Sequence, residues 1–373
     1  MIKRVVEQAV SDKLNSGKAI LLFGPRQTGK TTLLHQLLDK KKNVLWLNGD
    51  EADVQQLFAN ASSTRLKSVF GENKIIALDE AQRIPEIGIS LKLITDQIKE
   101  VQLIVTGSSA LELAGRTQEP LTGRKWEYFL YPVSFAEMVE HHGLLEEKRM
   151  IPHRLVYGCY PEIVNNPGRE KEVLKQLTDS FLYKDILMIE GLKKPARLIS
   201  LLQALAFQLG NEVSFNELGR TVGLDNQTVE KYIDLLEKTY VIFRLGALSR
   251  NLRKELKRGR KIYFYDNGVR NAIIAQFGPI ELRSDRGALW ENYLMSERRK
   301  YLAYNERWVN SFFWRTQDQQ EVDYVEEQDG RFLAWEFKWN PKVRVRLSKT
   351  FTNAYPDSVF NIISPQNAED FLS

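Results

Sequence analysis

The stretch "LLFGPRQTGKTT", residues 21–32, decides the fold of the N-terminal part of the chain. From Gly24 to Thr31 it matches the pattern G-x-x-x-x-G-K-[ST], with an apolar run at 19–23 before it and a helix-like segment at 30–38 after it. Backbone N–H groups of such a loop surround phosphate groups, and the N-terminus of the following helix adds partial positive charge. The sequence therefore predicts a phosphate-binding loop in a strand–loop–helix setting.

The residue types in this loop indicate ATP and Mg²⁺ as cofactors. We expect Lys30 to reach the β- and γ-phosphates and the Thr31 hydroxyl to bind Mg²⁺. The alternative is a loop whose glycines only turn the chain. The residues expected to bind the nucleotide are Gly24, Pro25, Arg26, Gln27, Thr28, Gly29, Lys30, Thr31 and Thr32.

A second acidic motif follows in "KIIALDEAQRIP", residues 74–85. Its apolar run ends in Asp79 and Glu80, which places both carboxylates at the carboxyl end of a strand, where open α/β sheets bind ligands. We expect Asp79 to hold Mg²⁺ and Glu80 to polarise the attacking water. The alternative role for this pair is an ordinary helix N-cap.

Two further segments supply candidates for catalysis. The run "LIVTGSSA", residues 103–110, ends in the hydroxyls of Thr106, Ser108 and Ser109, one of which could position the water; plain turn residues are the alternative. Arg116 and Arg124 are candidates for an arginine that acts in trans on the γ-phosphate of a neighbouring subunit. A solvated surface charge is the alternative for either arginine.

The alternation of short apolar runs with helical patterns predicts the fold class. Runs at 19–23, 44–47, 75–79 and 103–107 predict buried parallel strands of an α/β ATPase core. Residues 140–195 are predicted to be mostly helical, with one of the turns near Pro152.

Residues 196–250 have the order of elements of a winged helix. The pattern is a helix, a second helix capped by Ser214 and Glu217, a third helix from Asp225, and then strands. The basic run at 250–261 falls where the wing is expected. Alternatives are a solvated face and a module that binds protein or only packs. The candidate DNA contacts are Arg250, Arg253, Lys254, Lys257, Arg258, Arg260 and Lys261.

The segment "EVDYVEEQDGRFLAWEFK", residues 321–338, predicts a hairpin with a two-residue turn at Asp329-Gly330. In that register Asp323 faces Glu336, and Lys338 lies on the same face. This set is similar to the D…E-x-K signature of restriction-endonuclease-like folds, to which Glu291 of the preceding helix would add a carboxylate. The alternatives are a surface pairing of Glu321 with Lys338 and a nuclease fold that binds DNA without cutting it.

Composition limits the classes of protein that remain. The chain has 373 residues, 43% of them hydrophobic, a net charge of +5 and one cysteine, so a disulfide-stabilised fold is excluded. No apolar run approaches the ~20 residues needed to span a bilayer, and the N-terminal residues lack the apolar core of a signal peptide. We expect a soluble, cytoplasmic protein. Besides the wing, basic clusters at 296–300 and 341–349 place the positive charge in the C-terminal half.

The sequence also resembles a known family. The phosphate loop together with "LDEAQRIPE", "VTGSSALEL", "LTGRKWEYFLYPVSFAE" and "YGCYPEIV" is similar to bacterial and archaeal AAA+-type ATPases that carry a C-terminal nuclease-like domain of unknown role. The resemblance implies that Ser108 senses the γ-phosphate and that Arg124 is the arginine finger. It also implies four domains: an ATPase core (1–140), a helical lid (141–195), a winged helix (196–266) and a restriction-endonuclease-like domain (267–373).

Three functional hypotheses follow from these motifs. The first, which we favour, is an ATPase that remodels or translocates DNA as a homo-oligomeric ring, with a hexamer as one candidate. The second is a metal-dependent DNA nuclease gated by ATP. The third is a nucleotide switch that turns over little ATP and signals through protein partners.

Overall fold

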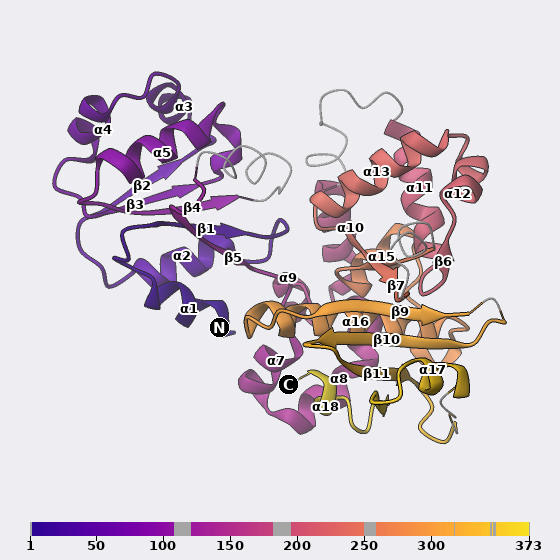
Figure 1. Cartoon of the computed structure of the whole chain (residues 1–373). Coiled ribbons are helices and arrows are strands. Elements are labelled where there is room, and N and C mark those ends of the chain that lie inside the picture. The colour runs from indigo at the N-terminus through magenta and orange to yellow at the C-terminus, as the bar shows by residue number, and fades with distance from the viewer. Residues whose placement is uncertain are drawn as a thin grey trace. The chain divides into compact units, whose positions relative to one another are not determined.

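The structure is a computed structural model, and it describes residues 2–107, 121–181, 195–249, 259–316, 318–343, 345 and 348–372. The chain forms two compact units (Figure 1). The N-terminal unit consists of residues 1–133 with 238–240, and the C-terminal unit consists of residues 134–237 with 241–373. Each unit is described separately below.

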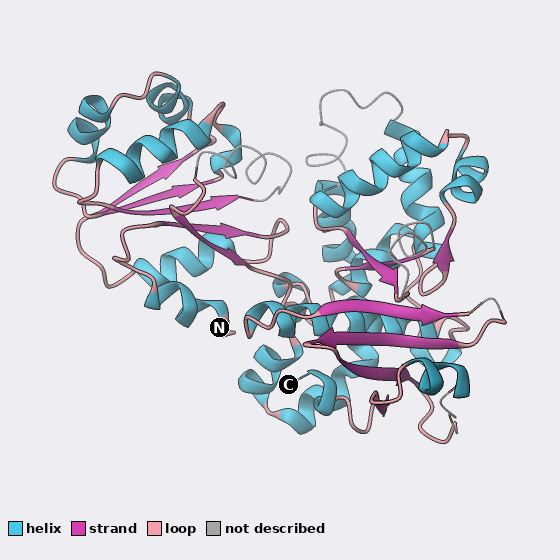
Figure 2. Ribbon diagram, in the orientation of Figure 1, coloured by secondary structure: helices cyan, strands magenta, loops and turns pink. Residues whose placement is uncertain are grey.

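A five-stranded sheet forms the centre of the N-terminal unit, in the order β2-β3-β4-β1-β5 with every pair parallel. Helices α3, α4 and α5 cover one face, and α1 and α2 cover the other (Figure 2). The elements are α1 (Val6–Asp12), β1 (Ala19–Phe23), α2 (Lys30–Leu38), β2 (Val44–Asn48), α3 (Ala52–Ala59), α4 (Ser63–Phe70), β3 (Ile75–Asp79), η1 (Ala81–Arg83), α5 (Ile87–Gln97), β4 (Gln102–Gly107) and β5 (Lys125–Phe129).

The strand order determines which side chains meet. Strands β1, β3 and β4 are buried along nearly their whole length, because helices cover both faces of the sheet. Since β4 lies between β1 and β3, the end of β4 lies between the phosphate loop and Asp79. The predicted α/β class with a P-loop parallel-sheet core is confirmed. Strand β5 was not predicted, because its sequence "KWEYF" mixes charged and aromatic residues at the edge of the sheet.

The C-terminal unit contains a second sheet of seven strands, in the order β12-β11-β10-β9-β7-β8-β6. Its elements are α7 (Phe135–His142), α8 (Leu144–Tyr157), α9 (Pro161–Asn165), α10 (Glu170–Phe181), α11 (Pro195–Phe207), β6 (Glu212–Val213), α12 (Phe215–Val222), α13 (Asn226–Lys238), β7 (Ile242–Ala247), β8 (Arg260–Phe264), α15 (Asn267–Ile273), η4 (Ile280–Leu282), α16 (Arg286–Tyr304), β9 (Asn310–Arg315), β10 (Glu321–Gln328), β11 (Arg331–Phe337), α17 (Lys349–Ala354), β12 (Val359–Ile363) and α18 (Glu369–Leu372).

The order α11-β6-α12-α13-β7-β8 is that of a winged helix, with β6 and β7 both antiparallel to β8. The Ser214 hydroxyl accepts a hydrogen bond from the Glu217 amide, and the Asp225 carboxylate accepts one from the Thr228 amide, so both helices begin at their predicted caps. Strand β7 also pairs in parallel with β9, at Gly246–Phe312 and Ala247–Phe313. The wing strands and the strands expected in a separate C-terminal domain therefore share one sheet.

The turn predicted near Pro152 is wrong, because α8 continues through this residue to Tyr157. Packing overrides the local preference: Ile151 and Leu155 on either side of the proline are fully buried. The carboxyl end of α8 is also satisfied from outside, since the Asn271 amide donates hydrogen bonds to the carbonyls of Leu155 (3.0 Å) and Val156 (2.8 Å).

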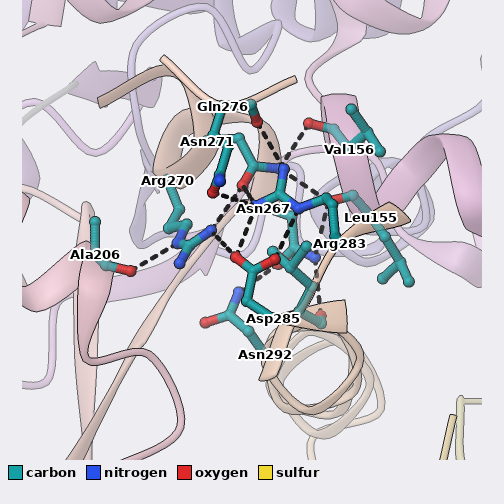
Figure 3. Close-up of polar contacts among 11 residues, drawn as sticks. Leu155, Val156, Ala206, Asn267, Arg270, Asn271, Gln276, Arg283, Asp285 and Asn292 are labelled. Atoms are coloured by element: carbon teal, nitrogen blue, oxygen red, sulfur yellow. Dashed lines mark hydrogen bonds and ion pairs between the residues drawn. The ribbon is translucent and has the colours of Figure 1, made fainter. Parts of the chain in front are cut away.

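A buried polar cluster joins α8, α11, α15 and α16 (Figure 3). The Asp285 carboxylate accepts hydrogen bonds from Arg270 (2.7 Å) and from Arg283 (2.7 and 2.8 Å). Arg270 also donates to the Ala206 carbonyl, and Asn267 donates to the Leu289 carbonyl. Burial alone would raise the pKa of Asp285, but the hydrogen bonds from the two arginines outweigh it and lower this pKa to about 2. The cluster is an ion-paired junction between four helices.

Candidate functional site

The phosphate loop of the N-terminal unit runs from the end of β1 to the start of α2. Gly24 has φ +148°, and a Cβ atom built there would lie 2.2 Å from the Leu130 carbonyl oxygen, so only glycine fits. Lys30 is buried, and its ammonium group donates to the carbonyls of Gly24 (2.9 Å) and Pro25 (2.7 Å). Lys30 is thus held over the concave side of its own loop, where a phosphate group would compete for the same protons.

Asp79 connects the loop to the neighbouring strand ends. Its carboxylate accepts hydrogen bonds from Thr31 (2.7 Å) and from Thr106, the latter at the end of β4. Carboxylate and hydroxyl oxygens are the ligands that Mg²⁺ prefers, so Thr31 and Asp79 fit the predicted metal site. The fully buried Thr106 is the one of the three predicted hydroxyls that the structure describes, and it donates to Asp79 and accepts from the Glu80 amide.

Glu80 occupies an unusual backbone conformation at the same edge. Its φ of +51° is left-handed, which is uncommon for a residue other than glycine and costs of order 1 kcal/mol or more. The Glu80 amide donates to the Thr106 hydroxyl (3.2 Å), and the carboxylate accepts a hydrogen bond from the Gln82 side chain. Two neighbours thus hold Glu80 in place, and Gln82 was not among the predicted site residues.

The remaining residues predicted for ATP hydrolysis are Ser108, Ser109, Arg116 and Arg124. Ser108, Ser109 and Arg116 fall outside the described residues. Arg124 is partly exposed and donates to the Asp96 carboxylate (2.5 Å) and to the Thr122 carbonyl (3.2 Å) of its own unit. To act on a neighbouring subunit, Arg124 would first have to leave Asp96.

A second set of charged residues lies on the sheet of the C-terminal unit. The predicted hairpin register is confirmed, from the pair Tyr324–Trp335 to the pair Gln328–Arg331. Asp329 and Gly330 both have positive φ, as a two-residue hairpin turn requires. Asp323 accepts a hydrogen bond from the Phe337 amide (2.7 Å), and Lys338 donates to Glu336 (2.7 Å).

Lys261 contributes the central cation of this set. Its ammonium group lies 2.9 Å from Glu291 and 2.5 Å from Glu321, and only 1% of its side chain is exposed. Tyr263 on the same strand also donates to Glu291 (2.6 Å). Glu321 therefore pairs with Lys261. The alternative of a surface pairing between Glu321 and Lys338 is wrong, since Lys338 pairs with Glu336.

The pKa shifts reflect how closely these charges are gathered. Burial raises the pKa of Asp323 well above its usual value, and the nearby charges of Glu291 and Glu336 raise it further. Burial alone would lower the pKa of Lys261, but the charges of Glu291, Glu321 and Asp323 outweigh it and raise this pKa. The cluster of Lys261, Glu291, Glu321, Asp323, Glu336 and Lys338 is called the acidic cluster below.

The acidic cluster does not fit a divalent metal as it is arranged. Among the residues that the structure describes, no group of three or more histidine, cysteine, aspartate or glutamate side chains is placed to hold a metal ion. Lys261 pairs with both Glu291 and Glu321, Lys338 pairs with Glu336, and a backbone amide donates to Asp323. The cations that stand among these four carboxylates are therefore two lysines of the chain itself.

Several residues predicted as a basic surface are placed differently. Lys261 is internal, so its prediction as a DNA contact is wrong. In the cluster at 296–300, Arg298 forms two buried hydrogen bonds with Glu326, and Lys300 is buried against Glu297. Of the other wing residues, Arg260 is half-exposed and lies 3.8 Å from Glu230. The wing residues outside the described part of the chain are Arg250, Arg253, Lys254, Lys257 and Arg258.

Comparisons with known proteins agree with the geometry of the N-terminal unit. Residues 16–139 match the family described as AAA domain. These findings support a P-loop ATPase of the AAA type. Residues 148–279 and 286–369 match two domains of unknown function, DUF8612 and DUF4143. Neither match identifies a nuclease.

Similar proteins extend over most of the chain. The solved structure of a Walker-type ATPase of Pyrococcus abyssi covers 74% of this chain and 96% of its own, with a TM-score of 0.52 and 17% identity, which shows a shared fold. An uncharacterized Mycobacterium tuberculosis protein is 26% identical, covering 87% of this chain and 71% of that protein. An uncharacterized Haemophilus influenzae protein is 28% identical, covering 69% of this chain and 70% of that protein.

The sequence did not indicate three contacts of these sites: Gln82 with Glu80, Thr106 with Asp79, and Lys261 with Glu291. The last two join residues that are far apart in the sequence. The ATPase motif predicts its own loop and strand end but not the side chains that support them.

Among the described residues, no helix combines the length and apolar character needed to cross a membrane.

Proposed function

We propose that this chain hydrolyses ATP at the edge where β1, β3 and β4 end, and that it uses this cycle to act on DNA bound by its C-terminal unit as a homo-oligomer. The observation that carries the ATPase part is the convergence of Lys30, Thr31, Asp79 and Glu80 at one sheet edge. The DNA part is supported by the winged-helix order of elements in the C-terminal unit.

The chain's own residues divide the work of hydrolysis. Lys30 would leave the carbonyls of Gly24 and Pro25 for the phosphate oxygens. Thr31 and Asp79 would hold Mg²⁺, which neutralises phosphate charge when bound. Glu80 would orient water and accept its proton, while the Thr106 hydroxyl fixes the peptide on which Glu80 stands.

The winged-helix elements are better suited to contact the phosphates of DNA than the edges of its bases. The exposed and half-exposed charged residues of α13 are of both signs, so this helix lacks the uniformly basic face that favours deep insertion between DNA phosphates; they are Glu230, Lys231, Asp234, Glu237 and Lys238. Arg260 and Arg315 line a groove of ≈ 880 Å³ where α12 and α13 meet the ends of β8 and β9. Their carboxylate partners lie 3.8 and 3.9 Å away, and exposed pairs this long contribute little, so a phosphate could replace them.

We also propose that the acidic cluster does not cleave DNA. A divalent ion would have to displace Lys261 before Glu291 and Asp323 could share it. We therefore expect the C-terminal unit to bind DNA and leave its strands intact. The predicted ring and the role of Arg124 in trans stay part of the proposal, to be tested through the dependence of the specific ATPase rate on protein concentration.

One experiment separates the candidate functions. ATP hydrolysis is followed at low salt with no DNA and with duplex, single-stranded or branched DNA, and the strands are run on a denaturing gel afterwards. The proposal expects faster hydrolysis with at least one DNA and intact strands. Cleavage in Mg²⁺ or Mn²⁺ that disappears in Asp323→Ala would instead establish a nuclease. Tight nucleotide retention with negligible turnover and no retained DNA would establish a switch.

A further inference from the structure

Arg4 lies beneath the phosphate loop, although it is 20 residues before Gly24 in the sequence. Only 6% of it is exposed. One guanidinium nitrogen donates to the Thr28 carbonyl (2.7 Å) and another donates to the Tyr131 carbonyl (2.6 Å). Arg4 therefore bridges the phosphate loop and the segment that follows β5.

The contact with Thr28 fixes the direction of one amide of the cradle. In a trans peptide the C=O and the following N–H point to opposite sides. Since Arg4 holds the Thr28 carbonyl, the Gly29 N–H points away from Arg4. Thr28 cannot easily turn, because it is fully buried and its hydroxyl donates to the Pro25 carbonyl (2.9 Å). Phosphate loops bind anions through N–H groups oriented in this way.

The second contact fixes the other wall of the loop. The Leu130 amide donates to the Phe23 carbonyl (2.8 Å), which continues the pairing of β5 with β1 up to the start of the loop. Tyr131 is the next residue, and Arg4 holds its carbonyl. A charged donor makes hydrogen bonds about twice as strong as a neutral one, so Arg4 firmly joins the loop, at Thr28, to the segment after β5, at Tyr131.

We infer that Arg4 is a positioning residue for nucleotide binding, which sets the Gly29 amide toward the phosphates. The inference rests on the proposed function, since it requires that the loop binds a nucleotide. A peptide N–H aimed at phosphate acts on the bound nucleotide and on the transition state alike, so its loss raises KM and leaves kcat nearly unchanged. ADP and ATP should be affected to a similar degree.

The test compares Arg4→Met and Arg4→Lys with the wild type, using a fluorescent N-methylanthraniloyl-ADP probe for affinity and steady-state hydrolysis for kcat and KM. Arg4→Met should weaken ADP binding by at least about tenfold and change kcat by less than about threefold. Arg4→Lys, which can keep one of the two contacts, should fall between. Lys3→Met removes the same charge from the exposed neighbouring position and should bind like the wild type.

The outcomes separate this inference from the proposed function. Probe binding by the wild type that equals binding by Arg4→Met overturns the role of Arg4 and leaves the ATPase proposal standing. Absence of probe binding by the wild type overturns both. If circular dichroism shows that Arg4→Met is unfolded, Arg4→Lys decides: a folded Arg4→Lys with wild-type affinity and KM overturns the inference, and a raised KM with unchanged kcat supports it.

Discussion

Asp285 provides a quantitative test of how the C-terminal unit is held together. The substitution Asp285→Asn keeps the shape of the side chain and removes the negative charge that faces Arg270 and Arg283 (Figure 3). Both arginine side chains are 3% exposed, and that of Asp285 is 24% exposed. The variant therefore leaves two buried guanidinium groups without their shared carboxylate.

Two independent routes give the size of the effect. Breaking a buried ion pair by removing one partner costs about 3–5 kcal/mol, and the partial exposure of Asp285 favours the lower end. The pKa of Asp285 falls from 3.8 to about 2, which corresponds to roughly 2 kcal/mol. We expect Asp285→Asn to lower the free energy of unfolding of this unit by roughly 2–3 kcal/mol at pH 7.

The pH dependence has a defined sign. A carboxylate whose pKa is lowered in the folded state stabilises it above the unfolded pKa, near 4, and this contribution is lost as the pH falls toward the folded value of about 2. The difference in the free energy of unfolding between wild type and Asp285→Asn should therefore have its full size at pH 7 and become smaller between pH 4 and 2.

The assay must report on the C-terminal unit alone, because a two-unit chain need not unfold in one step. Hydrogen exchange of peptides from α15 and α16 gives their opening free energy at pH 7, and urea midpoints cover the acid range. Glu281→Gln, which changes an exposed carboxylate of η4 four residues before Asp285, is the control. A loss below about 0.5 kcal/mol at pH 7, within the range of ordinary surface substitutions, would refute the reasoning.

Three further predictions concern the two sites. Glu80→Gln should lower kcat at least about 100-fold with nucleotide affinity nearly unchanged, whereas Glu86→Gln, an exposed glutamate that also has positive φ, should hydrolyse ATP normally in the same assay. Lys261→Met should destabilise the C-terminal unit by roughly 3 kcal/mol. Arg260→Met should change the stability in urea by less than about 1 kcal/mol and weaken DNA binding. A Lys261→Met variant that keeps its stability and loses DNA binding would make Lys261 a DNA contact. The folded-state pKa of Asp323 is raised, so its stabilising contribution is complete below about pH 4 and is lost as the pH rises through the folded pKa. The melting temperature of Asp323→Asn, relative to that of the wild type, should therefore increase with pH. A difference in melting temperature that stays constant with pH would contradict this.

The sequence was sufficient where a short segment carries its own geometry. The phosphate loop predicted the strand before it and the helix after it, because a phosphate-binding glycine pattern of this spacing stands between a strand and a helix. The hairpin register followed from Asp329-Gly330, since a two-residue turn fixes every pair along both strands. The caps at Ser214 and Asp225 were local as well.

The sequence was insufficient where a distant partner decides. The parallel pairing of β7 with β9 joins segments that were expected in different domains. Lys261 resembles its basic neighbours in sequence, yet strand alternation turns it toward Glu291 and away from the groove of Arg260. Basic residues at 296–300 looked like a surface patch, but α16 buries Arg298 and Lys300 against carboxylates that no local pattern identifies.

The most direct test of the account is the ATP hydrolysis rate measured against increasing duplex DNA at low salt, for the wild type and for a variant with the five cations of residues 250–258 changed to glutamine. The account predicts that DNA accelerates the wild type to a plateau and accelerates the variant much less, while both have the same rate without DNA. Equal rates at every DNA concentration, together with no retention of DNA by the wild type, would contradict it.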